Sequence, residues 1–161
     1  MLSNMNFISE GMMVAEWGKL DDASSVLAIL PIFHGFGLGV CVNACFMGGG
    51  KSILVPVFTP ETVASLIRSR KPSFVIGVPT LFDALSRDPK MQKADLSCLR
   101  ATFSGADALP RPVKERFESM VKRQGGNVQL LEGYGLTEDV TAIMATPLGS
   151  YREGSIGVPF P

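Results

Sequence analysis

Short apolar runs alternate along the chain with longer segments in which apolar residues recur at helical spacing. The runs have the length of buried strands, and we predict strands over residues 26–30, 52–57, 74–78, 99–103, 128–131 and 142–145. Strands that alternate with helices form a mostly parallel sheet with helices on both faces. The pattern therefore predicts a single α/β unit over residues 1–161.

The predicted helices begin and end at residues of suitable chemistry. A first helix is expected after Ser3 and runs to about Trp17, and a second covers residues 38–47 and ends at three glycines. Thr59 is expected to cap a third helix, because a proline and an acid follow it in the first turn. Thr80 is expected to cap a short fourth helix.

The clearest helical pattern covers residues 112–124. Its apolar residues fall at positions i, i+4, i+7 and i+8, and a glycine follows the last residue. These residues are Val113, Phe117, Met120 and Val121. They form one apolar face, which predicts a helix that packs on the sheet.

Ligands of α/β sheets bind in the crevice beyond the carboxyl ends of the strands. The predicted strands place four loops at this edge, over residues 31–37, 77–80, 104–109 and 132–139. We therefore expect the functional residues in these four loops.

The composition is rich in apolar residues and poor in charge. Hydrophobic residues make up 46% of the 161 residues before any of the 17 glycines is counted, and charged residues make up 19%. Typical globular chains have ~45–50% apolar residues with glycine included, and ~25% charged residues. This balance excludes intrinsic disorder, which needs low hydrophobicity and high charge. It also predicts exposed apolar surface, and hence self-association.

Charge and cysteine content narrow the classes of partner and compartment. The 15 basic and 15 acidic residues give no net charge, so the basic excess of nucleic-acid-binding proteins is missing. Cys41, Cys45 and Cys98 lie among apolar neighbours, and their odd number argues against a disulfide framework. The first residues lack the basic region of a signal peptide. Together these features predict a cytoplasmic protein.

Residues 26–47 carry no formal charge, which leaves a membrane span as one interpretation of this stretch. Pro31, His34, Asn43 and several glycines interrupt it. These residues favour a strand, a loop and a buried helix, and no transmembrane span.

Three local motifs fall short of the signatures that they resemble. Residues 48–52 end like a P-loop, but position 45 is a cysteine and a predicted strand follows. The G-x-G-x-x-G pattern that begins at Gly35 ends at a valine. Ser104 is not preceded by the glycine of a hydrolase elbow. We interpret all three as structural.

The loop over residues 132–139 concentrates residues suited to binding a nucleotide. Its glycines let a ligand approach the backbone closely, and Tyr134 offers a flat face for stacking. Thr137 can donate a hydrogen bond to a phosphate oxygen. Glu138 is a hard oxygen ligand of the kind that magnesium takes alongside substrate phosphates. A glycine turn with solvated acids is the alternative interpretation.

The segment from Tyr134 to Glu138 resembles the nucleotide signature of the adenylate-forming superfamily, which includes acyl-CoA synthetases, acyl-AMP ligases, luciferases and the adenylation domains of peptide synthetases. Four further segments resemble the family's motifs and follow its order. They are a histidine loop over 30–37, a strand end over 78–81, an adenine loop over 104–109 and a closing segment over 152–159. The resemblance covers essentially the whole chain, and its pattern looks most like fatty-acyl or medium-chain acyl-CoA synthetases.

The resemblance implies a nucleotide site. Tyr134 would stack on the adenine, with Ala106 and Asp107 along the other side of the ring. Thr137 would hold the α-phosphate, and Glu138 would hold a magnesium ion. Asp107 departs from the family pattern, in which this position is often small.

The resemblance also implies an acyl site beside the nucleotide. Gly105 and Gly133 would line the acyl and adenylate pocket, and His34 would position the carboxylate or gate the thioester step. A buried histidine with satisfied hydrogen bonds is the alternative for His34. The other residues assigned are Glu132 and Gly135 on the cofactor side, and Phe36, Val78 and Pro79 on the substrate side. The catalytic residues assigned are Thr137, Glu138 and His34.

The family's reaction is in-line attack of a carboxylate on the α-phosphorus of ATP. Pyrophosphate leaves, and coenzyme A then takes the acyl group from the acyl-AMP. The implied cofactors and co-substrates are ATP, Mg²⁺ and coenzyme A, together with a small-molecule carboxylic acid. This chemistry depends on positioning and charge neutralisation more than on covalent catalysis, which suits a site of glycines, a hydroxyl and one carboxylate.

Several parts of the family's catalytic set are missing from the sequence. They are the phosphate loop, the ribose-binding aspartate, the hinge and the small C-terminal domain with its catalytic lysine. We therefore hypothesise that the chain is a sub-domain of the N-terminal domain of a larger acyl-CoA synthetase and is inactive alone. A non-catalytic nucleotide-binding or interaction module is the alternative.

Overall fold

Seven strands form one sheet in the computed structural model, which describes residues 1–161, and their order is β2-β1-β3-β4-β5-β6-β7. The strands are β1 (Ser25–Ala28), β2 (Lys51–Leu54), β3 (Phe74–Gly77), β4 (Ala101–Ser104), β5 (Leu130–Tyr134), β6 (Met144–Ala145) and β7 (Val158–Pro159). The five strands β1–β5 are parallel, and β6 and β7 add to the edge in antiparallel pairing. The predicted α/β class with a mostly parallel sheet is confirmed.

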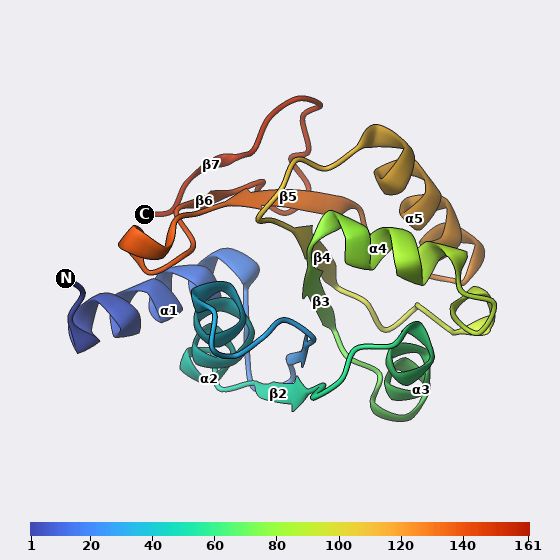
Figure 1. Cartoon of the computed structure of the whole chain (residues 1–161), viewed down its shortest axis with the longest axis horizontal. Helices are drawn as coiled ribbons and strands as arrows, with labels where there is room; N and C mark the ends of the chain where they lie inside the picture. Colours follow the sequence, from blue (N-terminus) through green and yellow to red (C-terminus); the bar gives the residue numbers. More distant parts are fainter.

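Two layers of helices cover the sheet. The helices are α1 (Asn4–Gly18), α2 (Ala44–Met47), α3 (Pro60–Arg70), α4 (Pro79–Arg87) and α5 (Arg111–Arg123), with the π-helix η1 (Phe36–Asn43) and the short 3-10 turns η2 (Met91–Lys93) and η3 (Thr137–Asp139). Figure 1 shows α1 and α2 on one side of β3 and β4 and α3, α4 and α5 on the other, with both chain ends on the side of α1. The prediction of helices on both faces is thus confirmed.

Each layer encloses its own apolar core. Leu27, Val75 and Leu130 alternate along the strands with residues of the opposite face and pack against α3, α4 and α5. In this layer the rings of Phe82 and Phe117 meet edge to face, with centroids 4.9 Å apart. The second core packs α1, η1 and α2 against the other face. It contains Val26, Ala28, Phe74, Ile76, Val14 and Val40.

Two helix predictions differ from the structure. Residues 38–47 do not form one α-helix, because the first eight residues from Phe36 form η1 and only the last four form α2. A wide π-turn is tolerated here by glycines, whose backbone lacks the steric limits of a Cβ. Thr80 is not a cap, because α4 begins one residue earlier at Pro79 after Val78. A proline fits the first helical position, since its missing N–H would have no partner there.

Strand ends also shift by a few residues, because pairing with a neighbour decides where a strand stops. The predicted run 128–131 becomes β5, which begins two residues later and extends to Tyr134 beside β4 and β6. The two-residue strand β7 was not predicted, since so short a segment carries no periodicity. The interpretation of residues 48–52 is confirmed, because Lys51 begins a strand and no helix follows it.

None of the helices is long and apolar enough to cross a membrane. The uncharged stretch 26–47 is divided into β1, a loop, η1 and α2, so the interpretation as a span is wrong. All three cysteines are free, and Cys41 and Cys45 are buried. Burial raises the pKa of the Cys41 thiol to about 12 and also raises that of Cys45, which keeps both thiols protonated and unreactive.

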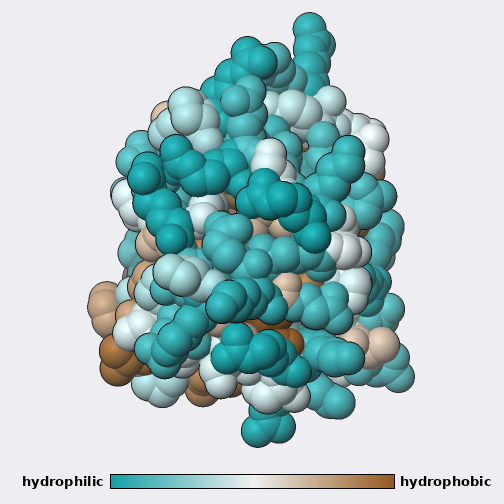
Figure 2. Space-filling view, turned by 90° about the vertical axis from the view of Figure 1, so that its right-hand side faces the viewer, coloured by the Kyte–Doolittle hydropathy of each residue, from teal (hydrophilic) through white to brown (hydrophobic).

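The two flanks differ in their surfaces. No large hydrophobic side chain between residues 58 and 133 is exposed, and Figure 2 shows the corresponding face as mainly hydrophilic. The flank of α1 and α2 instead exposes a group of apolar side chains. They are Met1, Leu2, Met5, Ile8, Met12, Phe46 and Met47, and we call them the α1 face. Other exposed apolar side chains lie in the segments 32–38 and 54–57 and after residue 133, so the layer of α3, α4 and α5 is the part that lacks them.

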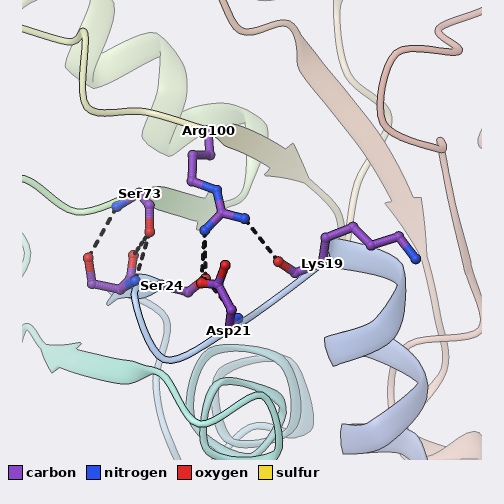
Figure 3. A network of polar contacts seen from close by, with 6 residues as sticks. Lys19, Asp21, Ser24, Ser73 and Arg100 are labelled. Carbon is purple, nitrogen blue, oxygen red and sulfur yellow. Dashed lines mark hydrogen bonds and ion pairs between the residues drawn. The ribbon is translucent and has the colours of Figure 1, made fainter.

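Arg100 ties the α1–β1 connection to the start of β4 (Figure 3). Its guanidinium donates to Asp21 Oδ1, to Ser24 Oγ and to the carbonyl of Lys19, each at 3.0 Å. It also lies over the ring of Phe74, 5.5 Å from the centroid. These contacts join three segments at the amino ends of the strands.

Ser25 and Ser73 link β1 to β3 at the same end (Figure 3). The Ser25 N–H donates to Ser73 Oγ at 2.7 Å, and the Ser73 hydroxyl donates to the Ser25 carbonyl at 3.1 Å. The Ser73 N–H returns a bond to the Ser25 carbonyl at 2.9 Å. This pairing fixes the register at which the central parallel strands begin.

Candidate functional site

A cavity of about 330 Å³ lies beyond the carboxyl ends of β4 and β5, beside the loop that leads from β1 into η1. Three of the four predicted loops contribute to its wall, from the segments 31–37, 104–109 and 132–139. The fourth loop, 77–80, lines a separate apolar groove through Val78 and Thr80. The cavity thus lies at the edge expected for a parallel sheet.

The cavity brings together nine of the residues predicted for the site. They are His34, Phe36, Gly105, Ala106, Gly133, Tyr134, Gly135, Thr137 and Glu138. Four other predicted residues, Asp107, Glu132, Val78 and Pro79, do not line it. The three predicted catalytic residues therefore share one wall, although more than a hundred positions separate His34 from the other two.

Pairing of the strands explains why the two glycine loops meet. In the parallel ladder Ser104 lies opposite Glu132, so the chain leaves β4 at Gly105 beside Gly133, where β5 continues to Tyr134 in pairing with β6. The N–H of Gly105 donates to the Gly77 carbonyl at 3.1 Å. A Cβ on Gly105 would lie 3.1 Å from the carbonyl oxygen of Gly133 and 3.1 Å from the ring of Phe36. A side chain at this position would therefore press on both neighbours, and glycine lets the three segments come together without a shift.

The backbone around the cavity includes strained positions. Ala106 has φ +67°, Val140 has φ +65° and Thr141 has φ +107°, a region that residues with a Cβ rarely adopt. Two hydrogen bonds hold this loop, from the Thr141 N–H to Leu136 at 2.9 Å and from the Ile143 N–H to Tyr134 at 3.0 Å. Such strain persists where the surrounding structure fixes it, and it clusters at functional sites.

His34 is exposed and lines the cavity, so the interpretation as a buried histidine is wrong. Its Nδ1 accepts a hydrogen bond from the N–H of Phe36 at 3.1 Å. In the neutral ring the proton is then on Nε2, which remains free to donate. The ring is thereby fixed at the first turn of η1.

The cavity has a polar rim and an apolar interior. Hydrophobic residues make up 15 of its 24 lining residues, and no lysine or arginine lies among them. Glu138 and His34 are the lining residues that can carry a charge near neutral pH, and both are exposed. The polar rim suits a phosphate-bearing group bound with a cation, and the apolar interior suits a hydrocarbon or aromatic group.

No group of three or more histidine, cysteine, aspartate or glutamate residues could hold a metal ion. Glu138 therefore offers a single carboxylate, next to the Thr137 hydroxyl on η3. One carboxylate fits magnesium, which is commonly bound through one or two carboxylates together with substrate phosphates. It does not fit a metal held by protein ligands alone.

Sequence reasoning missed the part of the wall that comes from α1. Val14, Trp17 and Leu20 line the cavity from this side, and Phe160 closes it with its ring 5.1 Å from that of Trp17. A signal was present in the unique tryptophan, which follows Val14 by one helical turn and so shares its face of the helix. The contribution of Phe160 had no sequence signal, since it depends on the pairing of β7.

The predicted residues outside the cavity have other contacts. Asp107 is exposed, and its carboxylate accepts from the N–H of Ala108 at 2.7 Å. Glu132 is half-buried, and burial raises its pKa while the charge of Lys114 partly offsets this effect. Pro79 is buried at the start of α4. None of these contacts depends on a ligand.

The whole chain, residues 1–161, matches the family model described as AMP-binding enzyme. The chain belongs to this family. It is 37% identical over 164 residues to a long-chain-fatty-acid–CoA ligase of Bacillus subtilis (strain 168), which covers all of this chain and 28% of that protein. It is 30% identical over 135 residues to a feruloyl-CoA synthase of an Amycolatopsis species, covering 83% of this chain and 26% of the relative.

Solved structures agree with this membership. MatB from Rhodopseudomonas palustris, in apo and ATP-bound crystal structures, superposes on this AMP-binding chain with a TM-score of 0.87 and 26% identity. The match covers all of the chain and 31% of MatB. The chain thus spans less than a third of the length of these relatives.

Proposed function

We propose that the protein from which this chain comes is an AMP-forming acid–thiol ligase, which activates a carboxylic acid as an acyl-AMP and transfers it to coenzyme A. The observation that carries the proposal is one cavity in which the Tyr134–Glu138 segment forms the rim and apolar side chains form the interior. Family membership and the ligases among the relatives support it.

Each side of the cavity has a role in the proposed reaction. Tyr134 and Ala106 hold the adenine, and the Thr137 hydroxyl donates to the α-phosphate. Glu138 would hold Mg²⁺, which neutralises phosphate charge when bound. His34 donates from Nε2 to the carboxylate at the junction of the two parts. These groups position the reactants, which is the main requirement of phosphoryl chemistry.

The acid in this proposal is a monocarboxylic acid with an apolar tail, such as a fatty acid. No basic residue lines the cavity, so a second carboxylate on the tail would have no partner there. The ligase of Bacillus subtilis acts on long-chain fatty acids according to its name, and this relative supports the fatty acid class.

We also propose that the isolated chain is catalytically incomplete. Attack on ATP requires neutralisation of the triphosphate, and the cavity offers no lysine or arginine for it. Pyrophosphate–ATP exchange, measured with a fatty acid and magnesium, should be at background for this chain and robust for the full-length protein. Robust exchange by the chain alone would contradict the incompleteness. No exchange by an intact, folded full-length protein with any carboxylic acid would contradict the ligase function.

The α1 face is the basis of a further proposal, that the isolated chain self-associates. Met5 is 65% exposed and Met12 59%, about two turns apart on α1, and Phe46 of the adjoining helix α2 is 61% exposed. Soluble monomers rarely expose contiguous apolar patches above a few hundred Å², roughly 300–600. Sedimentation at micromolar concentration should therefore show dimers or larger species. The double substitution Met5→Lys and Met12→Lys should shift these species toward monomer. A clean monomer of the unmodified chain would contradict this proposal.

A further inference from the structure

Glu10 is a buried acid without an ionic partner. It lies in the middle of α1 and is 1% exposed, and neither of its carboxylate oxygens makes a hydrogen bond within the protein. Ionised acids are almost never buried in this way unless they are paired. The position therefore calls for an explanation beyond packing.

The carboxyl of Glu10 lies at the junction of three segments. A Cβ on Gly39, in the centre of η1, would lie 3.2 Å from each of its oxygens, so the carboxyl rests on the bare backbone of the π-helix. Beside it, the Asn43 amide donates to the carbonyl of Phe7 at 2.7 Å and ties the end of η1 to α1. The backbone of Ala142 approaches from the loop that follows Glu138.

All three of these segments line the cavity, α1 through Val14 and Trp17. Phe36 and Val40 line it from η1, and Ala142 lines it from the loop. The Phe36 ring packs against Gly105, and the last π-type bond of η1 runs from the Ala44 N–H to the carbonyl of Gly39. Gly39, on which the carboxyl rests, thus lies between Phe36 and Val40, the two residues of η1 that line the cavity.

Burial favours the neutral form of Glu10. It raises the pKa of the carboxyl to about 7, although the nearby Asn43 amide and the Ala142 backbone, which approach without completing a hydrogen bond, lower it in part. The other ionisable residues on α1, η1, α2 and the loop are Glu16, Cys41, Cys45, Glu138 and Asp139, with His34 just before η1. None of them contributes to this pKa, and Glu16 is exposed and paired with Lys19.

We infer that Glu10 is a positioning residue for the cavity: its neutral carboxylic acid packs against Gly39 of η1 and the loop around Ala142, and this packing keeps both in the arrangement that binds ligand. Loss of the proton leaves a carboxylate with no positive partner between α1 and η1. Water must then enter, and the packing of η1 loosens. The inference rests on the proposed function only in taking this cavity as the ligand site.

Trp17 provides a test that needs no ligand. It is the unique tryptophan, lies on α1 seven residues after Glu10, and lines the cavity. Its emission and near-ultraviolet dichroism would be followed from about pH 5.5 to about pH 8.5 in the whole chain. Glu10→Gln keeps the shape of the neutral acid, and Glu16→Gln is the matched control on the same helix. His34→Gln serves as the background in which no histidine titrates.

The expected result is one transition near neutral pH in the unmodified chain, in Glu16→Gln and in His34→Gln. Glu10→Gln should show no such transition and should keep the low-pH spectrum throughout. If the double variant that carries both Glu10→Gln and His34→Gln still shows the tryptophan transition, the inference is wrong. So would the absence of a transition in the unmodified chain, if carboxyl carbon shifts show that Glu10 loses its proton in this range.

Ligand binding gives the second readout, with adenosine monophosphate as the probe. The affinity of the unmodified chain should fall several-fold between about pH 6 and about pH 8, and that of Glu10→Gln should change much less. Equal pH dependence in both would contradict the inference. If neither form binds the probe at any pH, nucleotide binding by the chain is wrong, and the tryptophan transition still decides the role of Glu10.

Discussion

Polar side chains at the two ends of the parallel sheet differ in whether they are hydrogen-bonded within the protein. At the amino ends of β1, β3 and β4, the side chains of Arg100, Ser24 and Ser73 are all hydrogen-bonded (Figure 3). Around the cavity at the carboxyl ends, Ser104 Oγ and Thr141 Oγ1 are buried and make no hydrogen bond within the protein. The polar groups at the amino ends thus join segments of the chain, and those at the carboxyl ends have hydrogen-bonding capacity left for a ligand.

This difference separates the parts of the molecule that maintain the fold from the parts that meet a ligand. Most buried polar groups in proteins are hydrogen-bonded, so an unpaired one requires an explanation. Ser104 and Thr141 lie in or next to the strained segments of Ala106 and Thr141, whereas the buried amide of Gln124, also unpaired, lies apart at the end of α5. Unpaired groups and local strain at one edge are tolerated because the other edge and the two cores supply the stability.

The largest effect should come from Glu10, the unpaired acid of the cavity side. Its pKa is raised from 4.5 to about 7, so the unfolded chain releases this proton at a lower pH than the folded one. Stability should therefore fall as pH rises from 4.5 through about 7, and the full penalty is present above that value. Glu10→Gln should be the more stable form at about pH 8, by up to about 3 kcal/mol.

Urea unfolding at several pH values measures this difference. Below the pKa of the unfolded acid, Glu10→Gln and the unmodified chain should be about equally stable. Glu16→Gln is the control, since its carboxyl is exposed and its pKa is lowered by the hydrogen bond from Lys19. A Glu10→Gln variant that is less stable than the unmodified chain at every pH would mean that the carboxylate has a favourable partner.

Arg100→Ala should give the next largest effect, at the paired end. It removes three hydrogen bonds and the contact with the ring of Phe74, and leaves Asp21 without its ionic partner. Arg100 is 42% exposed on its side chain, so we expect a loss of about 2 kcal/mol, below the value for a buried network. Thermal unfolding checks it, with Arg123→Ala as a control that removes one exposed contact to Gln92.

The same comparison shows what the sequence could predict about the fold. Local patterns located α1, α3 and α5 within a few residues, because caps and apolar spacing are local properties. They did not predict η1, since a π-helix depends on the packing of Gly39 beneath Glu10. Nor did they predict β7, which exists only through its pairing with β6.

The site was predicted where its residues lie in strand-end loops and missed where they come from elsewhere. His34, Gly105 and Tyr134 line one cavity because each lies at or beyond the carboxyl end of a parallel strand, the edge at which such sheets bind ligands. Trp17 reaches the cavity from a helix, and Phe160 from a segment that folds back from the end of the chain. Sequence patterns predict single helices and strands, whereas the contacts of Trp17 and Phe160 with the cavity depend on how helices and strands pack together.

Glu138→Gln should separate ligand binding from stability. The carboxylate is exposed at the cavity rim and makes no ion pair, so its loss should leave the unfolding midpoint unchanged. Affinity for ATP should fall roughly tenfold in the presence of magnesium, about 1.4 kcal/mol, and much less with a chelator present. Calorimetric titration measures the affinity under both conditions, and Asp139→Asn, at the next residue, is the control. An equal loss with and without magnesium would contradict the metal-binding role.

The smallest changes in stability should come from a serine-to-alanine substitution at each end of the parallel sheet. Ser73→Ala removes a hydroxyl that accepts from the Ser25 N–H at 2.7 Å and donates to its carbonyl at 3.1 Å, so it should cost about 1 kcal/mol. Ser104→Ala removes a hydroxyl that is 2% exposed as a residue and has no partner, so stability should stay unchanged or rise slightly. Chemical unfolding of the two variants in parallel compares them directly. Equal losses would mean that Ser104 has a hydrogen-bond partner in solution, and the contrast between the two ends of the sheet would then be wrong.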